Sequence, residues 1–87
     1  MPYIEQKDRD AYDTAIDRLV GLLADQPIGH VNYVISRIIW KLFRIQRSYT
    51  AGNNLIGVLE CAKAEFYRRQ LAPYEDEKLK ENGDVDI

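Results

Sequence analysis

Cys61 and His30 carry the side chains best suited to nucleophilic or metal chemistry, and the chain contains only one of each type. A cysteine nucleophile needs a neighbouring base, but these two residues fall in different predicted helices. Neither an internal disulfide nor a zinc site built on cysteine or histidine pairs is available. We interpret Cys61 as a small, half-buried packing residue in a reducing compartment. The sequence assigns no catalytic residue, no metal ligand and no cofactor.

Arginine and aromatic side chains offer a second kind of chemistry, the binding of anions. Residues 27–59 contain no Asp or Glu but four basic residues. The candidate anion-binding residues are Arg44, Arg47, Arg68 and Arg69. Trp40 and Tyr67 lie near them in the sequence and could stack on bases, as in nucleotide or single-stranded nucleic-acid binding. The alternative is a basic middle helix whose charge is neutralised by acidic neighbours within a bundle.

Paired carboxylates would be required for acid–base or magnesium chemistry. Glu60 and Glu65 are five residues apart, which places them about 140° apart on a helix rather than on one face. We expect them to pair with Lys63, Arg68 or Arg69. No Glu-x-x-His motif of a di-iron bundle occurs, and no glycine-rich phosphate loop is present.

Glu81-x-x-Asp84 keeps one enzymatic alternative open. The MazG-like all-helical nucleotide pyrophosphohydrolases carry paired Glu-x-x-Glu and Glu-x-x-Asp motifs that bind magnesium, and this segment resembles the second motif. It contains Gly83, however, and spans a predicted helix end, and the partner Glu-x-x-Glu motif is missing. A metal-dependent nucleotide hydrolase is therefore the remote third alternative.

The elements that would position these residues are three helices, because the apolar residues recur with a helical period throughout. We predict helices over residues 9–25, 30–47 and 53–81, with a turn at Ile28-Gly29 after Pro27. Thr50 or Asn53 is the expected N-cap of the third helix. Pro73 should kink that helix rather than end it, and Asn82-Gly83 has the composition of a C-cap. The predicted fold is an all-α, up-down-up three-helix bundle.

Each predicted helix has an apolar stripe for the core. These stripes are Tyr12, Ile16, Leu19, Val20 and Leu23; Val31, Val34, Ile35, Ile38, Leu42 and Ile45; and Leu55, Val58, Leu59, Ala62 and Phe66. Tyr33, Trp40, Arg44 and Arg47 fall opposite the second stripe, with Phe43 beside them, so the middle helix is apolar or aromatic nearly all round.

The third helix also has surplus faces, one of small residues and one of large apolar residues. The candidate interface residues are Tyr33, Trp40, Phe43, Gly57, Cys61, Ala64, Tyr67, Leu71 and Tyr74. Because small domains often supplement a thin core by oligomerising, we expect a homo-oligomer, with a dimer favoured. Packing within one chain and a different protein partner remain open.

Length and composition place the chain among soluble single domains. It has 87 residues, of which 46% are hydrophobic and 30% charged, with a formal net charge of −2. This balance argues against a dedicated duplex-DNA binder. Residues 19–24 form the longest apolar run, which is too short to cross a membrane, and the polar start shows no signal peptide. We therefore expect a single cytoplasmic domain.

Several segments resemble a small family of uncharacterised proteins found in bacteriophages and in some bacteria and archaea. The resemblance covers most of the chain, from MPYI and NYVISRIIW to its most specific parts, GVLE, EFYRR, APYED and NGDV. It implies a phage-related or bacterial origin and supplies no activity. The run from Glu65 to Leu79 is then interpreted as a structural clasp at an oligomer interface, with Arg68, Arg69, Glu75 and Asp76 forming ion pairs around the kink. The predicted function is a self-associating, non-enzymatic interaction protein.

Overall fold

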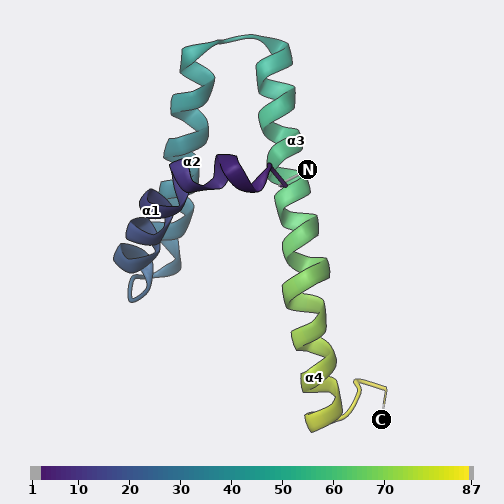
Figure 1. Ribbon diagram of the computed structural model, residues 1–87. Helices are drawn as coiled ribbons and strands as arrows, with labels where there is room; N and C mark the ends of the chain where they lie inside the picture. The colour runs from purple at the N-terminus through teal and green to yellow at the C-terminus, as the bar shows by residue number, and fades with distance from the viewer. Residues whose placement is uncertain (1–2, 87) are drawn as a thin grey trace. The chain divides into compact units, whose positions relative to one another are not determined.

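The computed structural model describes residues 3–86, and every regular element in this range is helical. Figure 1 shows the helices in chain order. The chain divides into two compact units, which within the described range are residues 3–55 and 56–86. The all-α prediction is confirmed, while the up-down-up arrangement and the oligomeric state stay predictions.

The first unit begins with α1, Gln6–Leu23. This helix starts three residues before the predicted boundary, because Glu5 already has extended backbone angles and its carbonyl accepts the Asp8 N–H at 2.9 Å. Asp8 lies in the first turn, where a carboxylate suits the positive end of the helix dipole. The helix ends with Ala24 donating its N–H to the Val20 carbonyl.

The second helix, α2, spans Ile28–Ile45 and begins directly after Pro27. Pro27 is the extended N-cap residue, and its carbonyl accepts the His30 N–H at 2.9 Å. The predicted turn at Ile28-Gly29 is therefore wrong, because both residues lie in the first helical turn. Proline fits at this boundary since its φ is compatible with both an extended N-cap and a helix start.

The third helix, α3, spans Tyr49–Phe66 and starts four residues before the predicted boundary. Ser48 is its capping side chain, because its Oγ accepts the N–H of Ala51 at 3.0 Å. The expected N-caps were wrong, since Thr50 and Asn53 lie inside the helix.

The second unit contains the end of α3, a π-helical turn over Tyr67–Leu71 and α4, Ala72–Asn82. The Ala72 N–H bonds to the Tyr67 carbonyl, five residues back, instead of to the fourth. Pro73 has no N–H for the Arg69 carbonyl and its ring would crowd that group in a regular α-helix. The wider turn accommodates the proline, so the helix continues past Pro73 and its irregularity lies in the preceding turn. The ribbon in Figure 1 accordingly runs from α3 into α4 without a break.

The C-terminal cap of α4 agrees with the sequence. Gly83 has a positive φ of 86° and donates its N–H to the Leu79 carbonyl at 2.9 Å. Glycine adopts this conformation without the steric cost that a Cβ would bring. The predicted Asn82-Gly83 cap is confirmed.

No side chain between residues 3 and 86 is fully buried. In α1 the half-buried apolar residues are Leu19 and Leu23, and in α2 they are Val31, Val34, Ile39 and Phe43. The predicted stripe of α2 was wrong for Ile35, Ile38, Leu42 and Ile45, which are all exposed. The predicted stripe of α3 is half-buried only at Leu55.

Phe43 explains part of this difference. A Cβ placed on Gly52 would lie 3.5 Å from the Phe43 ring, so the ring sits against the backbone of the α3 N-terminus within the first unit. That distance is an ordinary van der Waals contact, so the ring packs directly on this turn of α3. The last turns of α2 consequently direct Phe43, and not Leu42 or Ile45, towards the beginning of α3.

Candidate interaction site

Four residues of α2 form an exposed row, which we call the arginine–aromatic strip: Tyr33, Arg37, Trp40 and Arg44. They are spaced i, i+4, i+7 and i+11. At about 100° per residue this spacing keeps all four within a narrow sector of one helix face. The strip therefore lies along three turns of α2 inside the first unit.

Each aromatic ring of the strip is covered by the arginine four residues later. The Arg37 and Arg44 Cζ atoms each lie 6.0 Å from the centroid of the ring they cover, Tyr33 and Trp40 respectively. Tyr33 is 63% exposed and Trp40 is 61% exposed, so both rings still have free area. Guanidinium groups at this distance are attracted by the ring quadrupole, which orders the arginine while leaving its N–H donors available.

The segment of sequence around the strip carries positive charges and no negative ones. Residues 26–59 contain no carboxylate. Within residues 3–86, the ion pairs include those that join Glu5 to Lys7, Glu60 to Lys63, Glu65 to Arg68 and Lys78 to Glu81. None of them involves a basic residue of α2. The strip thus presents positive charge beside exposed apolar area, a combination suited to an acidic and partly apolar partner.

The structure changes the membership of the predicted site. Arg47 lies beyond the end of α2 at Ile45, so it does not continue the strip. Phe43 is half-buried against Gly52, so it exposes less of its ring than Tyr33 and Trp40 do. Arg37 belongs to the strip although it was not among the candidates, and its i, i+4 spacing from Tyr33 was the signal for it.

Tyr67 is held by a hydrogen bond across the π turn. Its hydroxyl donates to Glu75 Oε1 at 2.9 Å. The π turn adds one residue to the helix. Two positions that are eight residues apart across this turn therefore lie about 20° from one another around the helix axis, as positions seven apart do in a regular α-helix. The hydrogen bond and the negative charge of Glu75 raise the pKa of Tyr67, with smaller contributions from desolvation and Asp76.

The arginines of the π turn are placed differently from those of α2. Arg68 donates to both carboxylate oxygens of Glu65, at 3.0 and 3.1 Å, and Lys63 pairs with Glu60 at 3.2 Å. The expectation that Glu60 and Glu65 pair with nearby bases is confirmed. Arg69 lies in the same turn as Arg68. The Tyr67–Glu75 hydrogen bond spans the turn, and the expected ion pairs of Arg68 and Arg69 with Glu75 and Asp76 stay a prediction.

The small residues that were predicted to form one face of α3 are Gly57, Cys61 and Ala64. Gly57 and Ala64 are exposed, and Cys61 is half-buried with a free thiol, as expected. Nothing lies within 4 Å of a Cβ built on Gly57. Their role at an interface stays a prediction.

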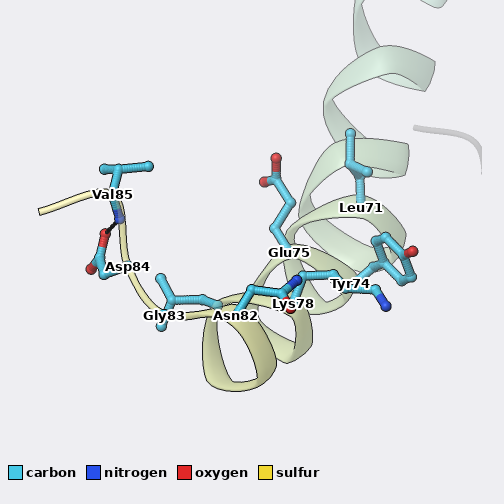
Figure 2. A pocket seen from close by; sticks show the side chains of 9 residues that line it. Leu71, Tyr74, Glu75, Lys78, Asn82, Gly83, Asp84 and Val85 are labelled. Atoms are coloured by element: carbon cyan, nitrogen blue, oxygen red, sulfur yellow. Dashed lines mark hydrogen bonds between the residues drawn. The ribbon is translucent and has the colours of Figure 1, made fainter. Parts of the chain in front are cut away.

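An open hollow of about 470 Å³ lies at the end of α4, within the second unit. Its apolar lining comes from Leu71, Tyr74, Leu79 and Val85. Figure 2 shows Glu75 between Val85 on one side and Leu71 on the other, with Lys78 beside Tyr74. Lys78 Nζ lies 5.6 Å from the Tyr74 ring centroid. Gly83 redirects the chain after α4, and Asp84 accepts the Val85 N–H at 2.6 Å.

The remaining carboxylate motif does not form a metal site. Glu81 pairs with Lys78 at 3.1 Å, whereas Asp84 lies beyond the helix end at Asn82. Within residues 3–86 no group of three or more His, Cys, Asp or Glu side chains could hold a metal ion. The described helices also include none that combines the length and apolar character needed to span a bilayer.

The molecule is thus an all-helical protein with an exposed arginine–aromatic strip in one unit and a locally paired helix in the other. A family model described as a domain of unknown function, DUF6899, matches residues 1–85. The chain belongs to this family, in agreement with its resemblance to uncharacterised proteins. Searches of curated proteins and of solved structures found no match.

Proposed function

We propose that the chain is a small, non-catalytic interaction protein that associates with itself through α2. The observation that carries this proposal is the absence of any fully buried side chain in residues 3–86, in a chain that is 46% hydrophobic. Soluble monomers rarely leave large contiguous apolar surfaces in water. Association of two copies would remove this surface from water.

The exposed apolar side chains of α2 lie on all sides of the helix. Ile45 is 81% exposed and Leu42 is 49% exposed, although both belong to the face opposite Trp40. A helix that is apolar all round is normally buried all round. Twofold dimers are the commonest arrangement of soluble oligomers, so a dimer is the favoured assembly. The family resemblance supports a phage-related or bacterial, cytoplasmic setting.

Trp40 provides the test, because it is the only tryptophan in the chain and lies in the middle of the strip. Buried tryptophans at interface centres are frequent sources of binding energy, about 2 kcal/mol or more on truncation. Trp40→Ala should therefore raise the dimer Kd by about 30-fold or more, measured by sedimentation over a concentration series. In the wild type, Trp40 emission should shift to the blue as concentration rises.

Tyr49→Ala is the matched control, since Tyr49 is 94% exposed at the start of α3 and lies outside the strip. It should leave the Kd within about twofold. Equal effects of Trp40→Ala and Tyr49→Ala would contradict a specific interface at the strip.

The two arginine–ring contacts also favour a second candidate function, the binding of nucleotides or single-stranded nucleic acid. Bases stack on exposed aromatic rings, and arginines without carboxylate partners attract phosphates. Quenching of Trp40 by an oligothymidylate at low salt would support it. Arg37→Ala with Arg44→Ala should abolish that quenching. If the oligothymidylate does not quench Trp40 of the wild type, this function is excluded.

A further inference from the structure

The two units carry opposite charge where they expose apolar surface. The segment 28–48 has four basic residues and no acidic residue, whereas 72–86 has six acidic and two basic residues. Each copy of the chain therefore contains both halves of a charge-complementary pair. Complementary charge aligns partners and suppresses wrong pairings.

We propose that the arginine–aromatic strip of α2 docks on the end of α4 in a second copy of the chain, with Trp40 facing the hollow described above. This proposal rests on the proposed self-association and names the surface that the strip contacts. The hollow has about 470 Å³, enough for an indole ring, and the apolar part of its lining comes from leucine, valine and tyrosine side chains. Apolar walls suit the exposed ring of Trp40.

Charged groups of opposite sign would meet when the strip docks on the hollow. Arg44 stacks on Trp40, so a ring that enters the hollow brings a guanidinium to its rim. Glu75 and Asp84 are the carboxylates among the residues that line the hollow. The hollow also contains Lys78, but its ammonium group already pairs with Glu81 at 3.1 Å. Arginine can bind a carboxylate through two N–H donors at once.

The arrangement closes on itself when two copies are related by a twofold axis. The strip of each copy then meets the α4 end of the other, which gives two identical contacts per dimer. A single head-to-tail contact would instead leave one strip and one hollow unused and continue into a chain of copies. The closed dimer is the form that we propose.

Charge exchange between two variants tests this pairing. One variant carries Arg37→Glu and Arg44→Glu on the strip, and the other carries Glu75→Lys and Asp84→Lys at the hollow. Each variant alone places like charges at both contacts, so we expect the homodimer Kd to rise at least tenfold at 0.1 M salt. Mixed in equal amounts, the two variants restore opposite charges at both contacts. Their heterodimer Kd should return to within about threefold of the wild-type value.

Matched controls separate pairing from net charge and from folding. Asp76→Lys with Glu77→Lys makes the same charge change on α4 at residues that do not line the hollow, and Lys7→Glu with Arg18→Glu does so on α1. Both should leave the wild-type Kd within about threefold. Circular dichroism of every variant should show unchanged helix content.

The outcomes of these experiments distinguish the pairing of strip and hollow from self-association in general. A wild-type dimer whose exchanged variants fail to recover on mixing would overturn the pairing of strip and hollow, while self-association would stand. A wild-type protein that stays monomeric would overturn both. Loss of oligonucleotide binding in the strip variant with an unchanged dimer Kd would assign the strip to nucleic acid and overturn the pairing.

Discussion

The charged side chains of the two units have different kinds of contact. In residues 56–86, the charged side chains form short-range contacts, as in the pairs Glu60–Lys63 and Glu65–Arg68. In α2, by contrast, Arg37 and Arg44 rest on aromatic rings and no carboxylate lies in the same stretch of sequence. Part of the charge in residues 56–86 is thus paired locally, whereas Arg37 and Arg44 of α2 contact aromatic rings and no carboxylate among residues 3–86.

The comparison also separates an aromatic residue that packs within the first unit from one that remains exposed. Phe43 is half-buried against Gly52 and contributes to the first unit itself. Trp40, three residues earlier on the same helix, is 61% exposed and contributes no comparable packing. Changes at Phe43 should therefore affect stability, and changes at Trp40 should affect association.

Phe43→Ala gives the largest stability effect that we expect. Full burial of a phenylalanine makes its truncation cost about 3–5 kcal/mol, and half-burial should reduce this to about 2 kcal/mol. Urea unfolding at fixed protein concentration measures the change. Tyr49→Ala is the control, because the side chain of Tyr49 is 94% exposed. Equal stabilities of the two variants would contradict the packing assigned to Phe43.

Gly52→Ala should stabilise the protein by about 0.5–1 kcal/mol, since alanine favours a helix interior over glycine. Its Cβ would meet the Phe43 ring at 3.5 Å, an ordinary contact distance. Gly57→Ala is the matched control on α3, where a Cβ meets nothing within 4 Å. Both variants should show similar gains in thermal unfolding. A loss at Gly52 alone would mean that the ring approaches the α3 backbone more closely than described.

Glu75→Gln should lower the pKa of Tyr67 towards the usual tyrosine value of about 10. In the wild type the hydrogen bond to Glu75 and its charge raise this pKa, because they favour the neutral phenol. A raised pKa in the folded state adds stability below pH 10 that is lost as pH rises through the folded pKa. The chain has six tyrosines, so an absorbance titration should be compared with that of Tyr67→Phe. An unchanged Tyr67 pKa in Glu75→Gln would contradict the hydrogen bond.

Pro73→Ala extends the same measurement to the π turn. Alanine restores an N–H at residue 73 and removes the ring that crowds the preceding turn. If the proline maintains the wide turn, a regular α-helix should replace it in the variant and place Glu75 about 80° from Tyr67 around the helix axis. The pKa of Tyr67 should then fall as in Glu75→Gln. A retained high pKa would show that the π turn does not depend on the proline.

Much of the secondary structure was predictable from local signals. Pro27 and Gly83 mark helix boundaries through their backbone preferences, and the apolar period defines the helices within a few residues. The Ser48 cap was predictable in principle, because serine before a helix is a strong N-cap. The π turn was not predicted, since Pro73 indicates a disturbance without specifying where the hydrogen bonds shift.

Burial was predicted less well than helix position. Ile35 and Leu42 fit a regular stripe, yet Ile39 and Phe43 are the half-buried residues. Periodicity defines faces of a helix, while the choice between faces depends on neighbours such as Gly52. Tyr33, Trp40 and Arg44 share one exposed face of α2, because their spacing alone places them together, while Arg47, predicted with them, lies beyond the helix end. The sequence contains no comparable signal for a partner.

Solution mass tests the central claim most directly. Light scattering coupled to size-exclusion chromatography should be run over a concentration series at 0.1 M and 1 M salt. One chain has a mass of 10.1 kDa, and we predict twice this mass at both salt concentrations, because apolar burial survives the screening that weakens ion pairs. The mass of a single chain at every concentration and at both salts would contradict self-association through α2.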